Sequence, residues 1–95
     1  MDEKKTTNIY FMKDKDNNVK IGRSEDVDRR KIQLQTSLIT ELEILYVIEE
    51  MAPSMEQHIH GICRRFHIKG EWFRGDVIKH LLSHEWYKEY MKKPS

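Results

Sequence analysis

Hydrophobic residues recur along the chain with two different periods, and the change of period predicts which segments are strands and which are helices. Short apolar runs at Asn8–Met12 and Val19–Gly22 flank the polar, turn-rich segment Asp14–Asn18, so we expect a β-hairpin. From Glu41 to Glu49, alternating apolar and polar positions predict a third strand that is mostly buried.

Three further segments have apolar residues every three to four positions, which is typical of amphipathic helices. The first is expected to begin with Ser24 as its N-cap and to extend to about Thr36. The second opens at Pro53 and Ser54, and its apolar stripe comprises Met55, Ile59, Ile62, Cys63 and Phe66. The third is expected over about residues 76–92, with Asp76 as its cap, and its buried side comprises Ile78, Leu81, Leu82, Trp86 and Tyr90.

The predicted order of elements is β-β-α-β-α-(β)-α, where the element in parentheses is a short extended or turn segment at Gly70–Phe73. This order describes an α+β fold, with a small antiparallel sheet of about three strands flanked by helices. Because the chain has 95 residues, we expect one domain over residues 1–95 with a single small core.

Composition narrows the class of protein. Charged residues make up 35% of the chain and hydrophobic residues 38%, which suits a globular protein rather than a disordered or membrane protein. No apolar run has transmembrane length, and no signal-peptide core follows Met1–Lys5, so we expect no membrane contact. The single cysteine, Cys63, excludes an internal disulfide and favours a reducing, cytoplasmic compartment. With a net charge of only +1, nucleic-acid binding would depend on local clusters of basic residues.

The second strand contains Lys20 and Gly22, two residue types that strand interiors disfavour. Tyr10 and Lys20 would lie directly opposite each other if the hairpin loop holds an odd number of residues, and apart if the number is even. An ammonium group beside the phenol would lower the pKa of Tyr10 and make it a base. A solvent-facing pair of side chains is the alternative interpretation.

Charged residues also lie next to the apolar faces of two predicted helices. Arg30 shares a face with Val27 and Leu34, where a guanidinium needs a carboxylate or phosphate partner. Glu56 and His60 are one turn apart beside the stripe of the second helix, where a carboxylate can bind Mg²⁺. The alternatives are a solvated basic patch around Arg30 and a first-turn glutamate at position 56 that the helix dipole favours.

In their order and spacing, these residues resemble the motifs of the GIY-YIG nuclease superfamily. The similarity is greatest to its compact branch from phages, large DNA viruses and bacteria, in which the second motif reads KIG. Asn8-Ile9-Tyr10 stands at the first motif and Lys20-Ile21-Gly22 at the second. Arg30 follows at the spacing of the catalytic arginine of that family.

The end of the resemblance is a glutamate and a histidine followed by the sequence GEWF. Glu56, His60 and the segment Gly70–Phe73 match this ending, so the motifs cover about residues 8–73. The chain departs from the usual pattern at Asn8, where glycine is common, and at Lys20, where tyrosine is common. At Leu34 many members carry histidine or tyrosine.

The resemblance implies a divalent-metal-dependent endonuclease that hydrolyses phosphodiester bonds of nucleic acid, with DNA favoured. It implies that Tyr10 orients or deprotonates the attacking water with help from Lys20, and that Glu56 is the protein ligand of Mg²⁺ or Mn²⁺. Arg30 would neutralise charge on the phosphorus. The complete expected site comprises the catalytic residues Tyr10, Lys20, Arg30 and Glu56, the phosphate-binding residues Gly22 and Arg23, and the supporting residues His60 and Glu71.

Two other functions fit the same sequence. A catalytically inactive domain of this kind would bind nucleic acid or act as a regulator. His60, Cys63 and His67, spaced i, i+3, i+7, would suit a Zn²⁺ module. For the nuclease, we expect sequence specificity to come from homo-oligomerisation or a partner protein. The expected location is the cytoplasm of a bacterium or of a host infected by a phage or virus.

Overall fold

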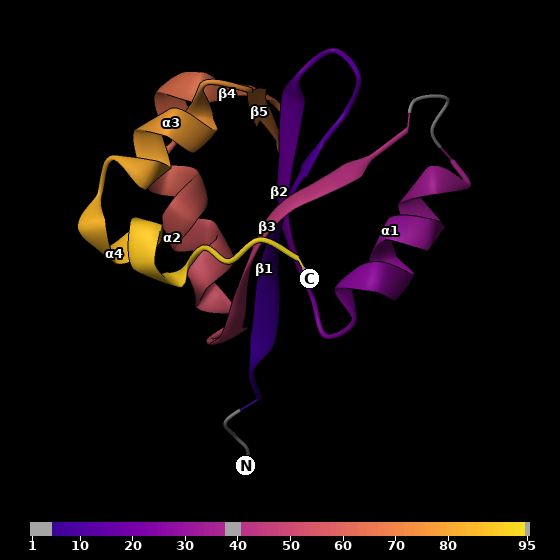
Figure 1. The fold of residues 1–95 in the computed structure, drawn as a ribbon, viewed down its shortest axis with the longest axis horizontal. Coiled ribbons are helices and arrows are strands. Elements are labelled where there is room, and N and C mark those ends of the chain that lie inside the picture. Colours follow the sequence, from indigo (N-terminus) through magenta and orange to yellow (C-terminus); the bar gives the residue numbers. More distant parts are fainter. Residues whose placement is uncertain (1–4, 38–40, 95) are drawn as a thin grey trace.

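A computed structural model describes residues 5–37 and 41–94 (Figure 1), so the N-terminal residues 1–4 of the expected domain lie outside the described part. Within the described residues, one antiparallel sheet has five strands in the order β3-β1-β2-β5-β4, and four α-helices accompany it. The strands are β1 (Thr7–Lys13), β2 (Asn18–Ser24), β3 (Glu43–Met51), β4 (His67–Lys69) and β5 (Trp72–Arg74). The helices are α1 (Val27–Gln35), α2 (Ser54–Ile62), α3 (Val77–Leu82) and α4 (Glu85–Tyr90), with a 3₁₀ turn at Arg64–Phe66.

These elements confirm the α+β class and correct the expected sheet of about three strands to one of five. The two additional strands form the β4–β5 hairpin, which is short and carries no clear alternation of apolar residues. All three residues of β4 are exposed, so the burial pattern that identifies strands in a sequence is missing there.

The expected hairpin of β1 and β2 is confirmed, and Asp14 organises its turn. The Asp14 carboxylate accepts hydrogen bonds from the backbone N–H groups of Asp16 and Asn18, both at 2.9 Å. Asn17 takes a left-handed conformation with φ of 65°, which asparagine tolerates better than most residues. Lys13 pairs with Val19 across the turn, and this pairing sets the register of the hairpin.

The two faces of the sheet carry alternate side chains of β1. Ile9 and Phe11 belong to the main apolar core, between the sheet and helices α2, α3 and α4. Tyr10 and Met12 point the other way and form a smaller cluster with half-buried residues of α1. Figure 1 shows α1 on one side of the sheet and the other three helices on the opposite side. Other members of the main core are Val19, Ile21, Ile48, Ile59, Cys63, Phe66, Phe73, Val77, Leu81, Tyr87 and Met91.

Helix α1 begins after Asp26, which replaces the expected Ser24 as N-cap. The Asp26 carboxylate accepts a hydrogen bond from the backbone N–H of Arg29 at 3.1 Å. Ser24 is the last residue of β2, and its hydroxyl donates to the Asp26 carbonyl at 2.9 Å. Aspartate and serine are equally good caps, so the length of β2 determines where the helix begins.

Strand β3 starts and ends two residues later than the expected 41–49, and the expectation that it is mostly buried is wrong. Among its nine residues only Ile48 is buried. β3 is at the edge of the sheet, and its neighbour on the outer side is the segment after α4. There Val47 and Lys92 exchange two backbone hydrogen bonds, of 2.8 and 2.9 Å.

The expected single helix over residues 76–92 is also wrong, because α3 ends at Leu82 and α4 begins at Glu85. At the break, the Ser83 hydroxyl donates to the His80 carbonyl at 2.6 Å and closes the last turn of α3. Asp76 makes no side-chain cap bond, and its carboxylate pairs instead with Arg74 at 3.5 Å. No helix in the described part of the chain is long and apolar enough to cross a bilayer.

The break between α3 and α4 changes which residues are buried. Tyr87 and Met91 enter the core, whereas Trp86 and Tyr90, expected on the buried side, are 41% and 40% exposed. Ile62 is likewise 39% exposed, because α2 ends there and a 3₁₀ turn follows. The Ile62, Trp86 and Tyr90 side chains therefore remain partly accessible.

Candidate functional site

The expected site residues meet where β2 continues past the end of β5. β5 pairs with β2 only as far as Lys20, so the backbone of Ile21 needs other partners. The Ile21 N–H donates to the backbone carbonyl of Glu71 at 2.9 Å, and the Nε2–H of His60 donates to the Ile21 carbonyl at 2.8 Å. This stretch of strand edge beyond the end of β5 therefore brings α2 and the segment before β5 together.

Glu56 and Glu71 place two carboxyl groups next to each other at this edge, where each shifts the pKa of the other. Burial and the neighbouring Glu71 raise the pKa of Glu56. Burial also acts to raise the pKa of Glu71, but the hydrogen bond from Glu56 and the charge of Lys20 outweigh it, so this pKa is lowered.

Three basic side chains surround the two carboxyl groups. Arg23 Nε lies 3.1 Å from Glu56 Oε1, and Lys20 Nζ lies 3.2 Å from Glu71 Oε1. His60 Nε2 lies 3.7 Å from Glu56 Oε2. The Lys20 side chain is only 13% exposed and also lies over the ring of Trp72. Positive charge therefore balances the acidic pair from both sides.

Tyr10 lies on the same face of the hairpin as Lys20, but the two are not directly opposite. Tyr10 pairs with Gly22, and Lys20 pairs with Met12. A direct pair of Tyr10 with Lys20 would require the hairpin loop to lie one residue earlier in the chain. Since Lys20 also pairs with Glu71, it does not promote a phenolate. Burial raises the pKa of Tyr10, and a hydrogen bond from Arg30 opposes this only in part. The expected lowered pKa of Tyr10 is therefore wrong.

Gly22 provides the space in which these groups meet. A Cβ atom at position 22 would overlap the Tyr10 phenol and lie 2.9 Å from Glu71 Oε1. Gly22 is itself buried, and protein side chains lie close beside it. Its function in the structure is to let Tyr10 and Glu71 approach each other.

Arg30 reaches the site from α1, as the helical spacing indicates. Val27 and Leu34 pack against the cluster that contains Tyr10, and Arg30 lies on the same side of the helix. Its guanidinium contacts the Tyr10 phenol and donates to Gln33 Oε1 at 3.4 Å. Arg30 is half-buried, so part of it remains available to a ligand.

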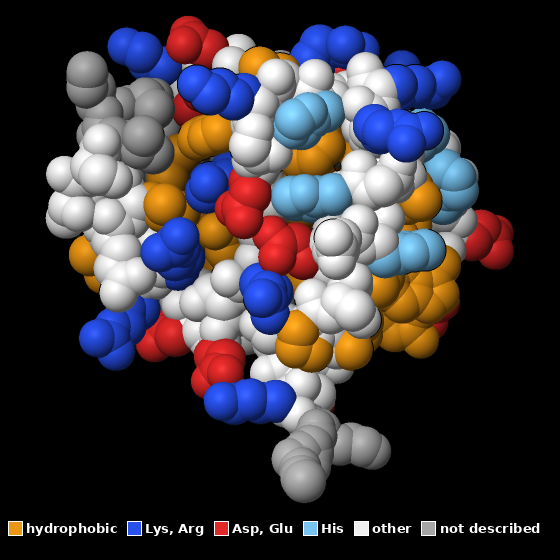
Figure 2. All heavy atoms as spheres, turned by 180° about the vertical axis from the view of Figure 1, so that it is seen from behind, with side chains coloured by type: hydrophobic (Ala, Val, Ile, Leu, Met, Phe, Trp, Pro, Cys, Tyr) orange, Lys and Arg blue, Asp and Glu red, His pale blue; other side chains and the backbone are white. Residues whose placement is uncertain are grey.

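An open cavity of about 430 Å³ borders the acidic pair. Its walls come from β2, the first turns of α2 and the segment before β5, and they include Arg23, Glu56, Gln57, His60 and Glu71. In Figure 2, acidic, basic and histidine side chains are mixed over the middle of one face, with hydrophobic side chains beside them at the lower right. A ligand in this cavity can therefore contact acidic, basic and histidine side chains at the same time.

The zinc interpretation of His60, Cys63 and His67 is wrong. Within the described residues, no three His, Cys, Asp or Glu side chains are grouped so that they could hold a metal ion. Cys63 is buried in the main core, and burial raises the pKa of its thiol to about 11. His67 lies in β4, beyond the end of α2, and its Nε2–H donates to the Gly70 carbonyl at 2.7 Å.

The central position of Glu71 was not predicted, since the sequence suggested only a supporting role. Glu71 contacts Lys20 and Glu56 and borders Gly22 and Tyr10. The signal in the sequence is an acidic residue between a glycine, Gly70, and a strand. In the structure Gly70 has φ of +55°. A glycine turn of this kind can aim the next side chain at a neighbouring strand.

The chain folds as a small α+β domain with a charged site at one strand edge. Comparison with known families identifies the family to which this domain belongs. The family model of the T5orf172 domain matches residues 7–93, so the chain belongs to the T5orf172 domain family. This match corrects the assignment to the GIY-YIG nuclease superfamily that the short motifs suggested. The T5orf172 domain is associated with nucleases, which indicates a role related to nucleic acid. Neither the curated proteins nor the solved structures gave a match.

Proposed function

We propose that the chain is a divalent-metal-dependent endonuclease that hydrolyses phosphodiester bonds of nucleic acid, with DNA favoured. The contact between the Glu56 and Glu71 carboxyl groups, in an open cavity bordered by Arg23, carries the proposal. Carboxylates bind hard cations, and arginines bind phosphate oxygens through paired hydrogen bonds. Both kinds of group are needed at a phosphodiester that is to be cleaved.

Mg²⁺ or Mn²⁺ fits this set of donors. Mg²⁺ in proteins is commonly bound by one or two carboxylates, while water and substrate phosphate fill the other positions. Glu56 and Glu71 repel each other when both are ionised, and a bound cation would offset this repulsion. Glu56 is the proposed ligand, with Glu71 next to it. Bound there, the ion would polarise the phosphate and stabilise the leaving oxygen.

The two arginines are the proposed phosphate-binding groups. Arg23 is half-exposed beside Glu56, and Arg30 approaches from α1 on the side of Tyr10. A phosphodiester held between them would lie against the acidic pair, where the guanidinium groups would neutralise charge that develops on the phosphorus. Each arginine already has one acidic or phenolic partner, which restricts its side chain before the substrate binds.

Tyr10 is proposed to orient the attacking water through a hydrogen bond. Burial raises the pKa of its phenol, which favours a role for Tyr10 as a hydrogen-bond donor over a role as the base. Lys20 acts on this step through Glu71, whose carboxylate it holds in place. His60 holds the backbone of β2, since its Nε2–H donates to the Ile21 carbonyl.

A cleavage assay tests the proposal on single-stranded, duplex and branched DNA and RNA, with Mg²⁺, Mn²⁺ or EDTA. We expect cleavage only with metal, loss of cleavage in Glu56→Gln, and normal cleavage in the control Glu49→Gln, whose side chain is exposed on β3. Both variants should still bind nucleic acid and show the wild-type circular dichroism spectrum. Cleavage by Glu56→Gln at the wild-type rate would contradict the role of Glu56. Binding without cleavage by the wild type would favour an inactive binding domain instead.

A further inference from the structure

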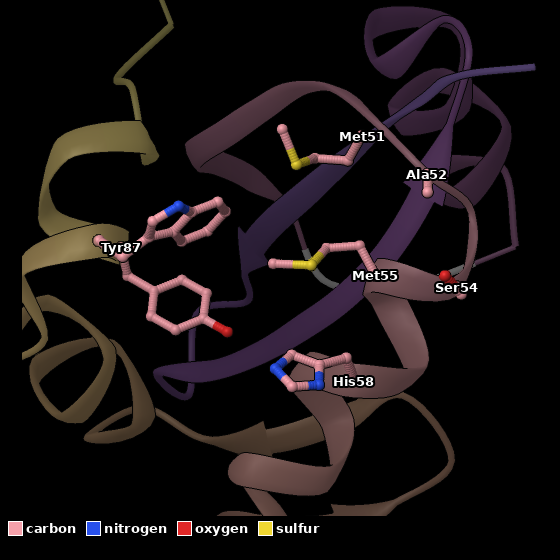
Figure 3. Close-up of a pocket in the computed structure, with 7 residues that line it drawn as sticks. Met51, Ala52, Ser54, Met55, His58 and Tyr87 are labelled. Atoms are coloured by element: carbon pink, nitrogen blue, oxygen red, sulfur yellow. The ribbon is translucent and has the colours of Figure 1, made fainter. Parts of the chain in front are cut away.

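A second cavity, of about 580 Å³, lies between the end of β3, the first turns of α2, and α4 (Figure 3). It is lined mainly by apolar and aromatic side chains, which include Met51, Met55, Trp86 and Tyr87. Figure 3 shows Met55 and Tyr87 pointing toward each other across this space, with His58 at one side. Its volume is within the range of about 300–1,000 Å³ that is common for small-molecule sites.

Trp86 makes this cavity unusual for a surface hollow. The indole is 41% exposed although it belongs to α4, and its ring centroid lies 4.7 Å from that of Tyr90 and 4.9 Å from that of Tyr87. These two ring contacts hold the indole in one orientation. An exposed aromatic side chain that is fixed in this way can stack on a planar ligand at little entropic cost.

The cavity is separated from the candidate active site only by the first turns of α2. Glu56 and His60 line the site cavity, whereas Met55 and His58 line the apolar one. Successive residues of one helix therefore face the two cavities. A nucleic-acid strand whose phosphate lies at Glu56 can reach the apolar cavity by crossing the start of α2.

We propose that this apolar cavity binds an unpaired nucleobase of the strand that is to be cleaved, with Trp86 as the stacking platform. This inference rests on the proposed nuclease function and adds a substrate class to it, namely nucleic acid with a single-stranded or extruded nucleotide beside the scissile phosphate. A paired base cannot enter, because its faces are covered by its neighbours in the duplex. The apolar walls take the ring, and the Ser54 hydroxyl and His58 ring offer hydrogen bonds to its edge.

Binding of fluorescently labelled oligonucleotides in EDTA tests the inference with three variants. Trp86→Leu keeps apolar volume but removes the aromatic face, Trp86→Phe restores a smaller face, and Ile68→Ala is a control at an apolar side chain, 50% exposed, on β4. We expect Trp86→Leu to weaken binding of single strands roughly tenfold, as for loss of one stacked base, and duplex binding by less than about threefold. Trp86→Phe should recover most of the affinity, and Ile68→Ala should match the wild type.

A series of strands with one abasic position locates the base. At one position in the strand, loss of the base should lower the affinity of the wild type by as much as the Trp86→Leu substitution does. The same abasic strand should lower the affinity of the Trp86→Leu variant little further. The inference is overturned if Trp86→Leu binds and cleaves like the wild type, and the proposed function then still stands. If the wild type binds no nucleic acid, both are overturned. If Trp86→Leu changes only the oligomeric state, measured by light scattering, the cavity is occupied by a second copy of the chain and the base-binding inference is overturned.

Discussion

The two faces of the β1–β2 hairpin differ in what covers them. On one face, Ile9, Phe11 and Ile21 are wholly buried under three helices. On the other, Tyr10 and Met12 lie under α1, which contributes no fully buried residue of its own. The first face supplies most of the apolar burial that stabilises the fold, and the second places the buried Tyr10 phenol beside Glu71 and Arg30. Adjacent residues of one strand can therefore be altered with very different results.

Phe11→Ala and Tyr10→Phe should give the largest contrast. Phe11→Ala leaves a cavity in the main core and should lower the free energy of unfolding by about 3–5 kcal/mol, a large part of the total for so small a protein. Tyr10→Phe keeps the ring and removes one hydrogen bond, which should cost about 1 kcal/mol. Urea unfolding and single-turnover cleavage would measure both effects. Tyr10→Phe should lose most of the cleavage rate while it remains folded, and normal cleavage would remove Tyr10 from the site.

Arg30→Ala tests the face under α1 by its effect on rate. Loss of one preorganised donor to the transition state should slow single-turnover cleavage roughly 10²–10³-fold. Arg30→Lys should recover little, since an ammonium group cannot reproduce the paired hydrogen bonds of a guanidinium. The matched control is Arg29→Ala, which removes an exposed arginine from the neighbouring position of α1. If both alanine variants slow the reaction equally, a general basic patch explains the effect.

Lys20→Met should give the smallest effect, and its size depends on pH. The charge of Lys20 contributes to the lowered pKa of Glu71, so its stabilisation is present above the ordinary carboxyl range and is lost as pH falls through the pKa of Glu71 in the folded state. The variant should therefore be less stable at neutral pH, by about 1 kcal/mol or less because Glu71 is partly exposed.

The pH dependence of thermal unfolding, measured without metal, checks the Lys20 prediction. The melting temperatures of Lys20→Met and the wild type should differ at neutral pH and converge in acid. Lys13→Met is the control, since it breaks the more exposed pair of Lys13 with Glu43. Equal melting temperatures of the Lys20→Met variant and the wild type at every pH would show that Lys20 does not stabilise Glu71.

Local periodicity predicted the parts of this site that depend on a single element. The spacing of Val27, Arg30 and Leu34 placed the arginine correctly, because one helix fixes all three directions. The sequence left open whether Tyr10 lies opposite Lys20, because their pairing depends on hairpin register. A shift of one residue in the loop moves a cross-strand partner by two positions, and no local pattern determines it.

The central role of Glu71 and the exposure of Trp86 depend on contacts between distant elements. Glu71 is held by a backbone bond to Ile21, across a strand edge that the sequence does not reveal. Trp86 became exposed because a helix expected to be continuous is broken at Ser83 and His84, where no proline or glycine marks the break. The short motifs indicated a different superfamily, and the family was identified only by a match over residues 7–93.

During synthesis, β3 leaves the ribosome well before Lys92, the residue whose backbone closes its outer edge at Val47. In this interval the strand presents unpaired N–H and carbonyl groups to other nascent chains, and such an edge is a template for association. By covering this edge, the segment after α4 should protect the chain from aggregation, although it adds only one bridge to the described sheet. A chain that stops before Lys92 would keep its apolar core and its candidate-site residues, and we expect it to self-associate through the open edge of β3.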